Sequence, residues 1–207
     1  MASQRTPWII PRIWPDSTVY IIGGGPSIMG MNLEVIRNKR VIGTNHAFQL
    51  YPWVDVLYFG DCQFRSMAPL DAWPGIKVTS CGRVPLLGQG WRGIRRIGRA
   101  KNYGIEHDKP GFVAWNDNTG ASAINIAYWL GASCVVLIGF DMHPAGKRHN
   151  YHDLYPARAR GYDPYKKHMR CWPYIARDAK ALGMEIINAT PGSAITDFEC
   201  KPLGETV

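Results

Sequence analysis

The residues best suited to chemistry form a glycine loop near the start of the chain. The loop consists of Gly23, Gly24, Gly25, Pro26 and Ser27. It follows residues 17–22, an apolar, β-branched run that predicts a buried strand. Glycine lets the backbone turn tightly and approach a ligand closely, and a helix that begins here would offer free N–H groups to a phosphate. We therefore predict a nucleotide- or phosphate-binding turn, with a plain tight turn as the alternative.

The loop belongs to neither of the two best-known phosphate-binding motifs. Pro26 and Ser27 interrupt the Gly-x-Gly-x-x-Gly pattern of dinucleotide-binding proteins. No Gly-Lys-Ser/Thr follows, so the P-loop is excluded as well.

A second candidate anion site lies at residues 116–120. Asn118 or Thr119 can cap the helix expected to begin there. The Thr119 hydroxyl and the N–H groups of Gly120 and Ala121 could also bind a phosphate or a ribose. A helix cap alone and a ligand site both remain open for this stretch.

Acidic and basic side chains supply further candidates. Asp61 and Asp141 each follow an expected strand, where they could hold Mg²⁺ beside a phosphate or simply accept backbone hydrogen bonds. His149 and His152 lie close together without a Glu or Cys partner, so we predict no zinc site. Either histidine could act as a general acid or base, since histidine titrates near neutral pH, and a solvated loop histidine is the alternative.

Periodicity predicts that strands alternate with helices. Strands are expected at residues 17–22, 40–44, 54–59, 76–80, 134–138 and 184–188, and helices at residues 28–38, 119–130 and 172–182. This order predicts an α/β fold, a Rossmann-like and mainly parallel sheet with helices on both faces. Ligands of such sheets bind at the carboxyl ends of the strands, where the candidate residues fall. We expect one domain over residues 1–207, with a loop-rich insertion at residues 62–115.

Composition limits the class of protein. The chain has 207 residues, 46% of them hydrophobic, and a net charge of +8, which favours anionic partners. One basic cluster could bind DNA or could be a solvated loop: Arg92, Arg95, Arg96 and Arg99. No apolar run is long enough to span a membrane, and the oligomeric state stays open.

The cysteines and the N-terminus suggest a compartment. The five cysteines are odd in number and include no Cys-x-x-Cys pair, so we expect no disulfide framework. Reduced thiols and the absence of an apolar leader predict a cytoplasmic protein.

Four landmarks together resemble two related families. Residues 19–27, Asn45, the segment 119–141 and the ending Thr-Pro-Gly-Ser at 190–193 are similar to the Campylobacter-type bacterial sialyltransferases, glycosyltransferase family 42. The same landmarks mark the domain-of-unknown-function family 115, which includes flagellin glycosyltransferase-like proteins and 6-hydroxymethylpterin pyrophosphokinases. The resemblance covers most of the chain except about residues 62–115.

The resemblance implies a sialyltransferase-like fold and a transferase without a required metal. Its donor would be a CMP-sugar or another nucleotide-sugar, and the transfer would invert the configuration at the anomeric carbon. It implies that the glycine loop, Asn45, Thr119 and Gly120 hold the nucleotide. His149 or His152 would be the general base, and tyrosines of the later polar stretch would bind the phosphate. Those tyrosines are Tyr151, Tyr155, Tyr162 and Tyr165.

One departure keeps other functions open. Gly24 stands where the sialyltransferases carry asparagine, which favours the family 115 side. The alternatives are a Mg²⁺-dependent pyrophosphokinase with Asp61 and Asp141 as ligands, and a non-catalytic protein that binds a nucleotide or DNA. A compact, basic domain of this kind would suit a phage or prophage gene.

Overall fold

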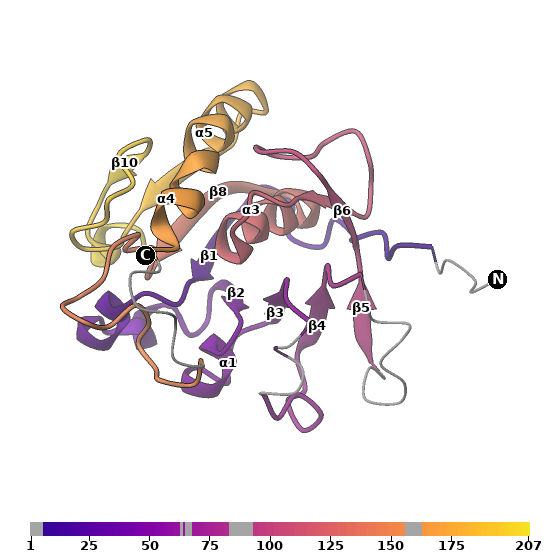
Figure 1. Ribbon diagram of the computed structural model, residues 1–207. Helices are drawn as coiled ribbons and strands as arrows, with labels where there is room; N and C mark the ends of the chain where they lie inside the picture. Colours follow the sequence, from indigo (N-terminus) through magenta and orange to yellow (C-terminus); the bar gives the residue numbers. More distant parts are fainter. Residues whose placement is uncertain (1–5, 63, 65–67, 83–92, 156–162) are drawn as a thin grey trace.

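The computed structural model describes residues 6–62, 64, 68–82, 93–155 and 163–207 (Figure 1). Within these ranges the strands are β1 (Ser17–Ile22), β2 (Arg40–Thr44), β3 (Val56–Phe59), β4 (Ile76–Thr79), β5 (Ile94–Arg96), β6 (Gly98–Ala100), β7 (Phe112–Ala114), β8 (Ala132–Ile138), β9 (Glu185–Asn188) and β10 (Glu199–Cys200). The α-helices are α1 (Ala47–Leu50), α3 (Thr119–Leu130), α4 (Tyr165–His168) and α5 (Trp172–Ala181). The 3₁₀ helices are η1 (Pro26–Gly30), η2 (Leu33–Ile36), η5 (Met169–Cys171) and η6 (Leu203–Glu205).

Eight strands form one sheet in the order β10-β9-β8-β1-β2-β3-β4-β5. Every neighbouring pair in this sheet is parallel. From β1 the chain builds the sheet outward to β5, then returns to the other side of β1 with β8 and continues to β10. The order therefore reverses between β1 and β8, and such a switch point is where open parallel sheets bind their ligands.

Both faces of the sheet are covered, as alternating side chains of β1 show. Val19 and Ile21 face one apolar core, which they share with α3 and α5. Tyr20 and Ile22 face a second core, formed with η1, η2 and α1. Figure 1 shows α3 and α5 above the strands and α1 below them. The predicted α/β fold with a parallel sheet is confirmed, although one face is covered by short helical turns in place of long helices.

Most of the elements expected from periodicity are present. The helix at residues 119–130 has the predicted bounds, with Asn118 as its N-cap and Gly131 as its left-handed C-cap at φ 107°. The predicted strands at residues 134–138 and 184–188 correspond to β8 and β9 within two residues at each end.

The helix predicted at residues 28–38 is wrong. The chain forms η1 and η2 there, separated by Met31, whose backbone is extended at φ −105° and ψ 138°. Gly30 disfavours a continuous helix, and the side chain of Asn32 accepts a hydrogen bond from the N–H of Glu34, which starts a new turn.

The stretch expected as a loop-rich insertion contributes to the main sheet. Within residues 62–115, β4 and β5 extend the eight-stranded sheet, and β6 pairs with β7 in a separate parallel sheet. Residues 97–100 continue directly from β5, so this part of the chain leads from the edge of the sheet back towards α3.

The expectation that no cysteines are joined is also wrong. Cys62 and Cys81 form a disulfide, with their Cα atoms 5.3 Å apart. They follow β3 and β4, which are neighbours in the sheet, so their loops meet although 19 positions separate them in sequence. The cytoplasmic location stays a prediction, and this bond joins two of the five cysteines whose reduced state was part of its basis. No helix in the described part of the chain is long and apolar enough to cross a membrane.

Candidate functional site

A large cleft lies at the carboxyl ends of β1, β2, β3, β4 and β8. Its volume is about 1040 Å³, at the upper end of the range for small-molecule sites. It brings together most of the predicted site residues: Gly23, Gly24, Gly25, Asn45, Asp61, Asn118, Thr119, Gly120, Asp141, His149, Tyr151, His152 and Tyr155. Pro26 and Ser27 are outside its lining, and Tyr162 lies outside the described residues.

The glycine loop lies on the end of β8. The N–H groups of Gly23 and Gly25 donate to the carbonyls of Ile138 and Gly139, at 2.7 and 2.8 Å. A Cβ at Gly23 would approach the Gly139 carbonyl oxygen to 2.6 Å, and one at Gly25 would lie 1.8 Å from Asp141 Oδ2. These glycines are therefore required because the two strand ends approach so closely.

Asp141 holds the glycine loop in place through two hydrogen bonds to Ser27. Its Oδ1 accepts the backbone N–H of Ser27 at 3.0 Å, and its Oδ2 accepts the Ser27 hydroxyl at 2.8 Å. The side chain is 4% exposed. A helix that begins at this loop was expected to offer free N–H groups to a phosphate. Because the Asp141 carboxylate accepts the N–H of Ser27, the structure makes Asp141 a positioning residue of the glycine loop.

The turn after β8 is also held by hydrogen bonds from the loop that follows β9. Thr190 Oγ1 accepts the N–H of Phe140 at 2.9 Å, and the Ser193 hydroxyl donates to the Phe140 carbonyl at 2.6 Å. The residues at 190–193 thus hold the β8 end of the cleft without lining it.

The N-terminus of α3 opens on the cleft. Asn118 Oδ1 accepts the N–H of Ala121 at 3.2 Å, so Asn118 is the helix cap. In the described chain, the N–H groups of Thr119 and Gly120 donate no hydrogen bond. Of the N–H donors predicted for an anion or ribose, that of Ala121 is therefore occupied by the cap, whereas that of Gly120 is free within the cleft.

Asn45 has a left-handed backbone conformation at the end of β2. Its φ is 51°, and its Oδ1 is buried without a hydrogen-bond partner in the described structure. Left-handed backbone also occurs at Asn116, Asp117 and Met142, close to or lining the cleft. Such backbone costs about 1–2 kcal/mol for most residues and concentrates at functional sites.

His46 and His152 lie in an aromatic cluster on one side of the cleft. Their ring centroids are 4.6 Å apart, and the rings of Tyr151 and Tyr155 pack against His152. Burial, followed by the neighbouring His46, lowers the pKa of His152 to about 4. Burial also lowers the pKa of His46 and raises that of the Tyr151 phenol. Both imidazoles are consequently neutral at pH 7.

His149 has a different environment. Its ring stacks on Tyr165 with an interplanar angle of 17°, and its Nδ1 lies 3.1 Å from the Tyr165 hydroxyl. That hydroxyl also lies 3.3 Å from the His149 carbonyl, to which it can donate its hydrogen. In the tautomer whose Nδ1 donates to Tyr165, Nε2 carries the lone pair that a general base needs.

Two charged side chains of the cleft were missed as ligand candidates. Lys167 pairs with Asp117 at 3.0 Å. Desolvation tends to raise the pKa of Asp117, but hydrogen bonds from Lys167 and Tyr103 outweigh it and lower that pKa. Arg99 lies across the cleft, with its Cζ 3.3 Å from the ring centroid of Trp115. The sequence indicates Lys167 only as a member of a basic run. It gives no indication that Trp115 would pack against Arg99.

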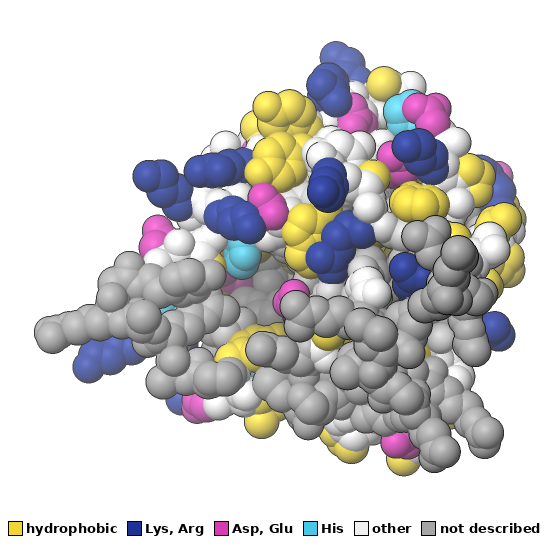
Figure 2. All heavy atoms as spheres, turned by 45° about the vertical axis from the view of Figure 1, so that its right-hand side comes forward, with side chains coloured by type: hydrophobic (Ala, Val, Ile, Leu, Met, Phe, Trp, Pro, Cys, Tyr) yellow, Lys and Arg dark blue, Asp and Glu magenta, His cyan; other side chains and the backbone are white. Residues whose placement is uncertain are grey.

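Two arginines of the predicted DNA-binding cluster have different surroundings. Arg95 is exposed, with its guanidinium 5.8 Å from the ring centroid of Trp8, whereas Arg99 is half-buried in the cleft. Arg92 lies outside the described residues. Figure 2 shows Lys and Arg side chains scattered among hydrophobic and acidic ones on the face in view. Binding of DNA by this cluster stays a prediction.

The two carboxylates expected to hold Mg²⁺ differ in their surroundings. Asp141 is bound by Ser27, while Asp61 is exposed at the rim. Within the described ranges, no group of three or more His, Cys, Asp or Glu side chains is arranged to hold a metal ion.

Comparison with known protein families, with curated proteins and with solved structures finds no match for this chain.

Proposed function

We propose that this protein is a transferase that binds a nucleotide-sugar in the cleft and moves its sugar to an acceptor hydroxyl. The observation that carries the proposal is the meeting of Gly23–Gly25 with the N-terminus of α3 at the point where the strand order reverses. Such a place supplies close backbone approach and free N–H groups to a phosphate-bearing ligand.

The volume of the cleft supports a ligand larger than a nucleotide alone. The lining extends across five strand ends, from β8 to β4, which is about 19 Å at a spacing of 4.8 Å per strand. Aromatic side chains on one side suit the stacking of a base or a sugar ring.

His149 is the proposed general base. Its Nε2 takes the proton of the acceptor hydroxyl as that oxygen forms a bond to the anomeric carbon. The bond from this carbon to the nucleotide phosphate breaks on the opposite side, and the leaving phosphate keeps the electron pair. His152 suits this role less, because a base whose pKa is about 4 has little driving force at neutral pH.

A Mg²⁺-dependent pyrophosphokinase is the second candidate, and no specific contact favours it. It would need Asp141 as a ligand, but both carboxylate oxygens already accept hydrogen bonds from Ser27. Neither proposal depends on the predicted phage origin or on the oligomeric state.

A panel of nucleotides tests the proposal by thermal unfolding, with Mg²⁺ and with a chelator. We expect CMP, a nucleoside diphosphate or the corresponding nucleotide-sugar to raise the melting temperature, because a ligand that binds only the folded state stabilises it. We expect the shift to persist in chelator.

A matched pair of variants locates the binding. Gly24→Leu places a large side chain in the loop, where a Cβ would lie 3.4 Å from Asn150 Oδ1. This variant should abolish the shift in melting temperature. Gly30→Leu is the control, because nothing lies within 4 Å of a Cβ there. No shift with any nucleotide would reject the proposal, and a shift that requires Mg²⁺ would favour the pyrophosphokinase.

A further inference from the structure

We propose that Arg99 forms a subsite for an oxyanion, a phosphate or carboxylate group of the substrate, at the β3–β4 end of the cleft. This deepens the proposed function, since it rests on the cleft being the substrate site and names the chemistry of one substrate group. The subsite lies away from the glycine loop, because two strand spacings, about 10 Å, separate the ends of β1 and β3.

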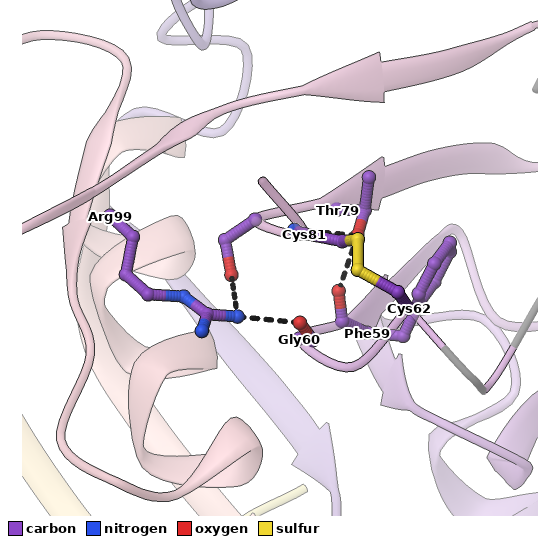
Figure 3. The surroundings of a disulfide bond; sticks show 7 residues. Phe59, Gly60, Cys62, Thr79, Cys81 and Arg99 are labelled. Carbon is purple, nitrogen blue, oxygen red and sulfur yellow. Dashed lines mark hydrogen bonds between the residues drawn. A yellow bond between two sulfur atoms is a disulfide. The ribbon is translucent and has the colours of Figure 1, made fainter. Parts of the chain in front are cut away.

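The guanidinium of Arg99 is fixed in position. It stacks on the Trp115 indole, and its Nη2 donates to the Gly60 carbonyl at 2.5 Å and to Ser80 Oγ at 3.3 Å. Figure 3 shows the side chain extending to the ends of β3 and β4, beside the disulfide that joins the two loops. A planar cation held in this way has lost its conformational freedom before a ligand arrives.

The neighbouring residues fix the position of the Arg99 guanidinium. A Cβ on Gly60 would lie 2.6 Å from the Trp115 ring, so glycine is needed for the ring to fit. The Tyr58 hydroxyl hydrogen-bonds to Ser80 Oγ at 2.8 Å and orients the second acceptor. The cation is therefore held by several independent contacts.

The positive charge of Arg99 is not neutralised by an ion pair. No carboxylate of the described chain lies within 4.0 Å of its guanidinium, and its Nε is buried without a hydrogen-bond partner. Asp61 acts on it only through space, from an exposed position where water screens the field. A half-buried cation that meets only a carbonyl and a hydroxyl favours an anionic ligand group, which arginine binds through paired N–H donors.

Titration with simple anions tests the subsite without any nucleotide. Inorganic phosphate and acetate are added separately at constant ionic strength, and their affinities are measured by calorimetry for the wild type and for Arg99→Gln. We expect the variant to bind the preferred anion at least about 10-fold more weakly, because one charge-assisted contact is lost. Preference for phosphate or for acetate identifies the substrate group.

Arg95→Gln is the matched control, because it removes the same charge from an exposed position beside Trp8. It should bind the anion as the wild type does. Wild-type affinity in Arg99→Gln, or binding of neither anion by the wild type, would overturn the proposal.

A second measurement covers the case in which Arg99→Gln fails to fold. The NMR signal of the Arg99 Nε–H, identified by its absence from Arg99→Lys, should move when the wild type is titrated with the anion. A signal that stays in place while the anion binds would overturn the subsite. Since no nucleotide is used, failure of the nucleotide panel and failure of this test are distinguishable.

Discussion

The carboxylate of Asp141 binds the backbone N–H and the hydroxyl of Ser27, 114 positions earlier in the chain. This double contact joins the turn after β8 to the loop after β1, across the point where the strand order reverses. It gives the glycine loop a defined shape in the absence of a ligand.

Removing the Asp141 carboxylate should destabilise the fold. Asp141→Ala leaves two donors of Ser27 without an acceptor in a site where the aspartate is 4% exposed, so we expect a loss of about 2–4 kcal/mol in the free energy of unfolding. Urea denaturation measures this. Asp16→Asn is the control, because its side chain is 85% exposed and its φ of 54° suits asparagine. Equal unfolding free energies for the two variants would contradict a structural role for Asp141.

His149 should matter for turnover more than for binding. His149→Gln removes the proposed base, and we expect turnover of the nucleotide-sugar identified by the panel to fall by about 10²–10⁴-fold with little change in donor affinity. His143→Gln serves as the control, because this exposed histidine bonds the Gly192 carbonyl at 2.9 Å outside the cleft. Normal turnover in His149→Gln would show that another residue is the general base.

Acid should destabilise the protein through His152. Burial lowers its folded pKa to about 4, below the ordinary value of 6.5, so between these values only the unfolded state binds the proton. The free energy of unfolding should therefore fall as the pH falls from 6.5 to 4. Urea denaturation at several pH values should show a weaker fall in His152→Gln.

His143 provides the opposite case for this pH experiment. Hydrogen bonds to the Pro144 and Gly192 carbonyls raise its pKa, so its folded state binds the proton more readily than the unfolded state. His143→Gln should leave the fall with acid at least as steep as in the wild type. If the free energy of unfolding of His152→Gln depends on pH as it does in the wild type, another group is responsible for the loss of stability in acid.

The disulfide should contribute to stability. Replacing both Cys62 and Cys81 with serine, or reducing the bond, frees a loop closed over 19 positions, and we expect a loss of about 2–4 kcal/mol. The oxidised, denatured protein should show three reactive thiols, those of Cys134, Cys171 and Cys200. Cys200→Ser is the control, because this cysteine is exposed and unpaired. Five reactive thiols without reductant would show that the pair is not joined.

Local patterns were enough to predict much of the fold and part of the site. The bounds of α3 and the end of β1 follow from periodicity, an Asn cap and glycines at fixed positions, all of which act within a few residues. The polar residues of the cleft were found because strand ends in a parallel sheet share one edge.

Residue spacing is sufficient to predict the alternation of strands and helices and the residue types at the strand ends. Which of these residues meet depends on the three-dimensional arrangement of the strands. Ser27 could cap a helix or bind Asp141, Arg99 could be exposed or lie on Trp115, and Cys62 could be free or joined to Cys81. Each outcome depends on the strand order and on close approach between distant segments, and neither is encoded in the spacing of neighbouring residues.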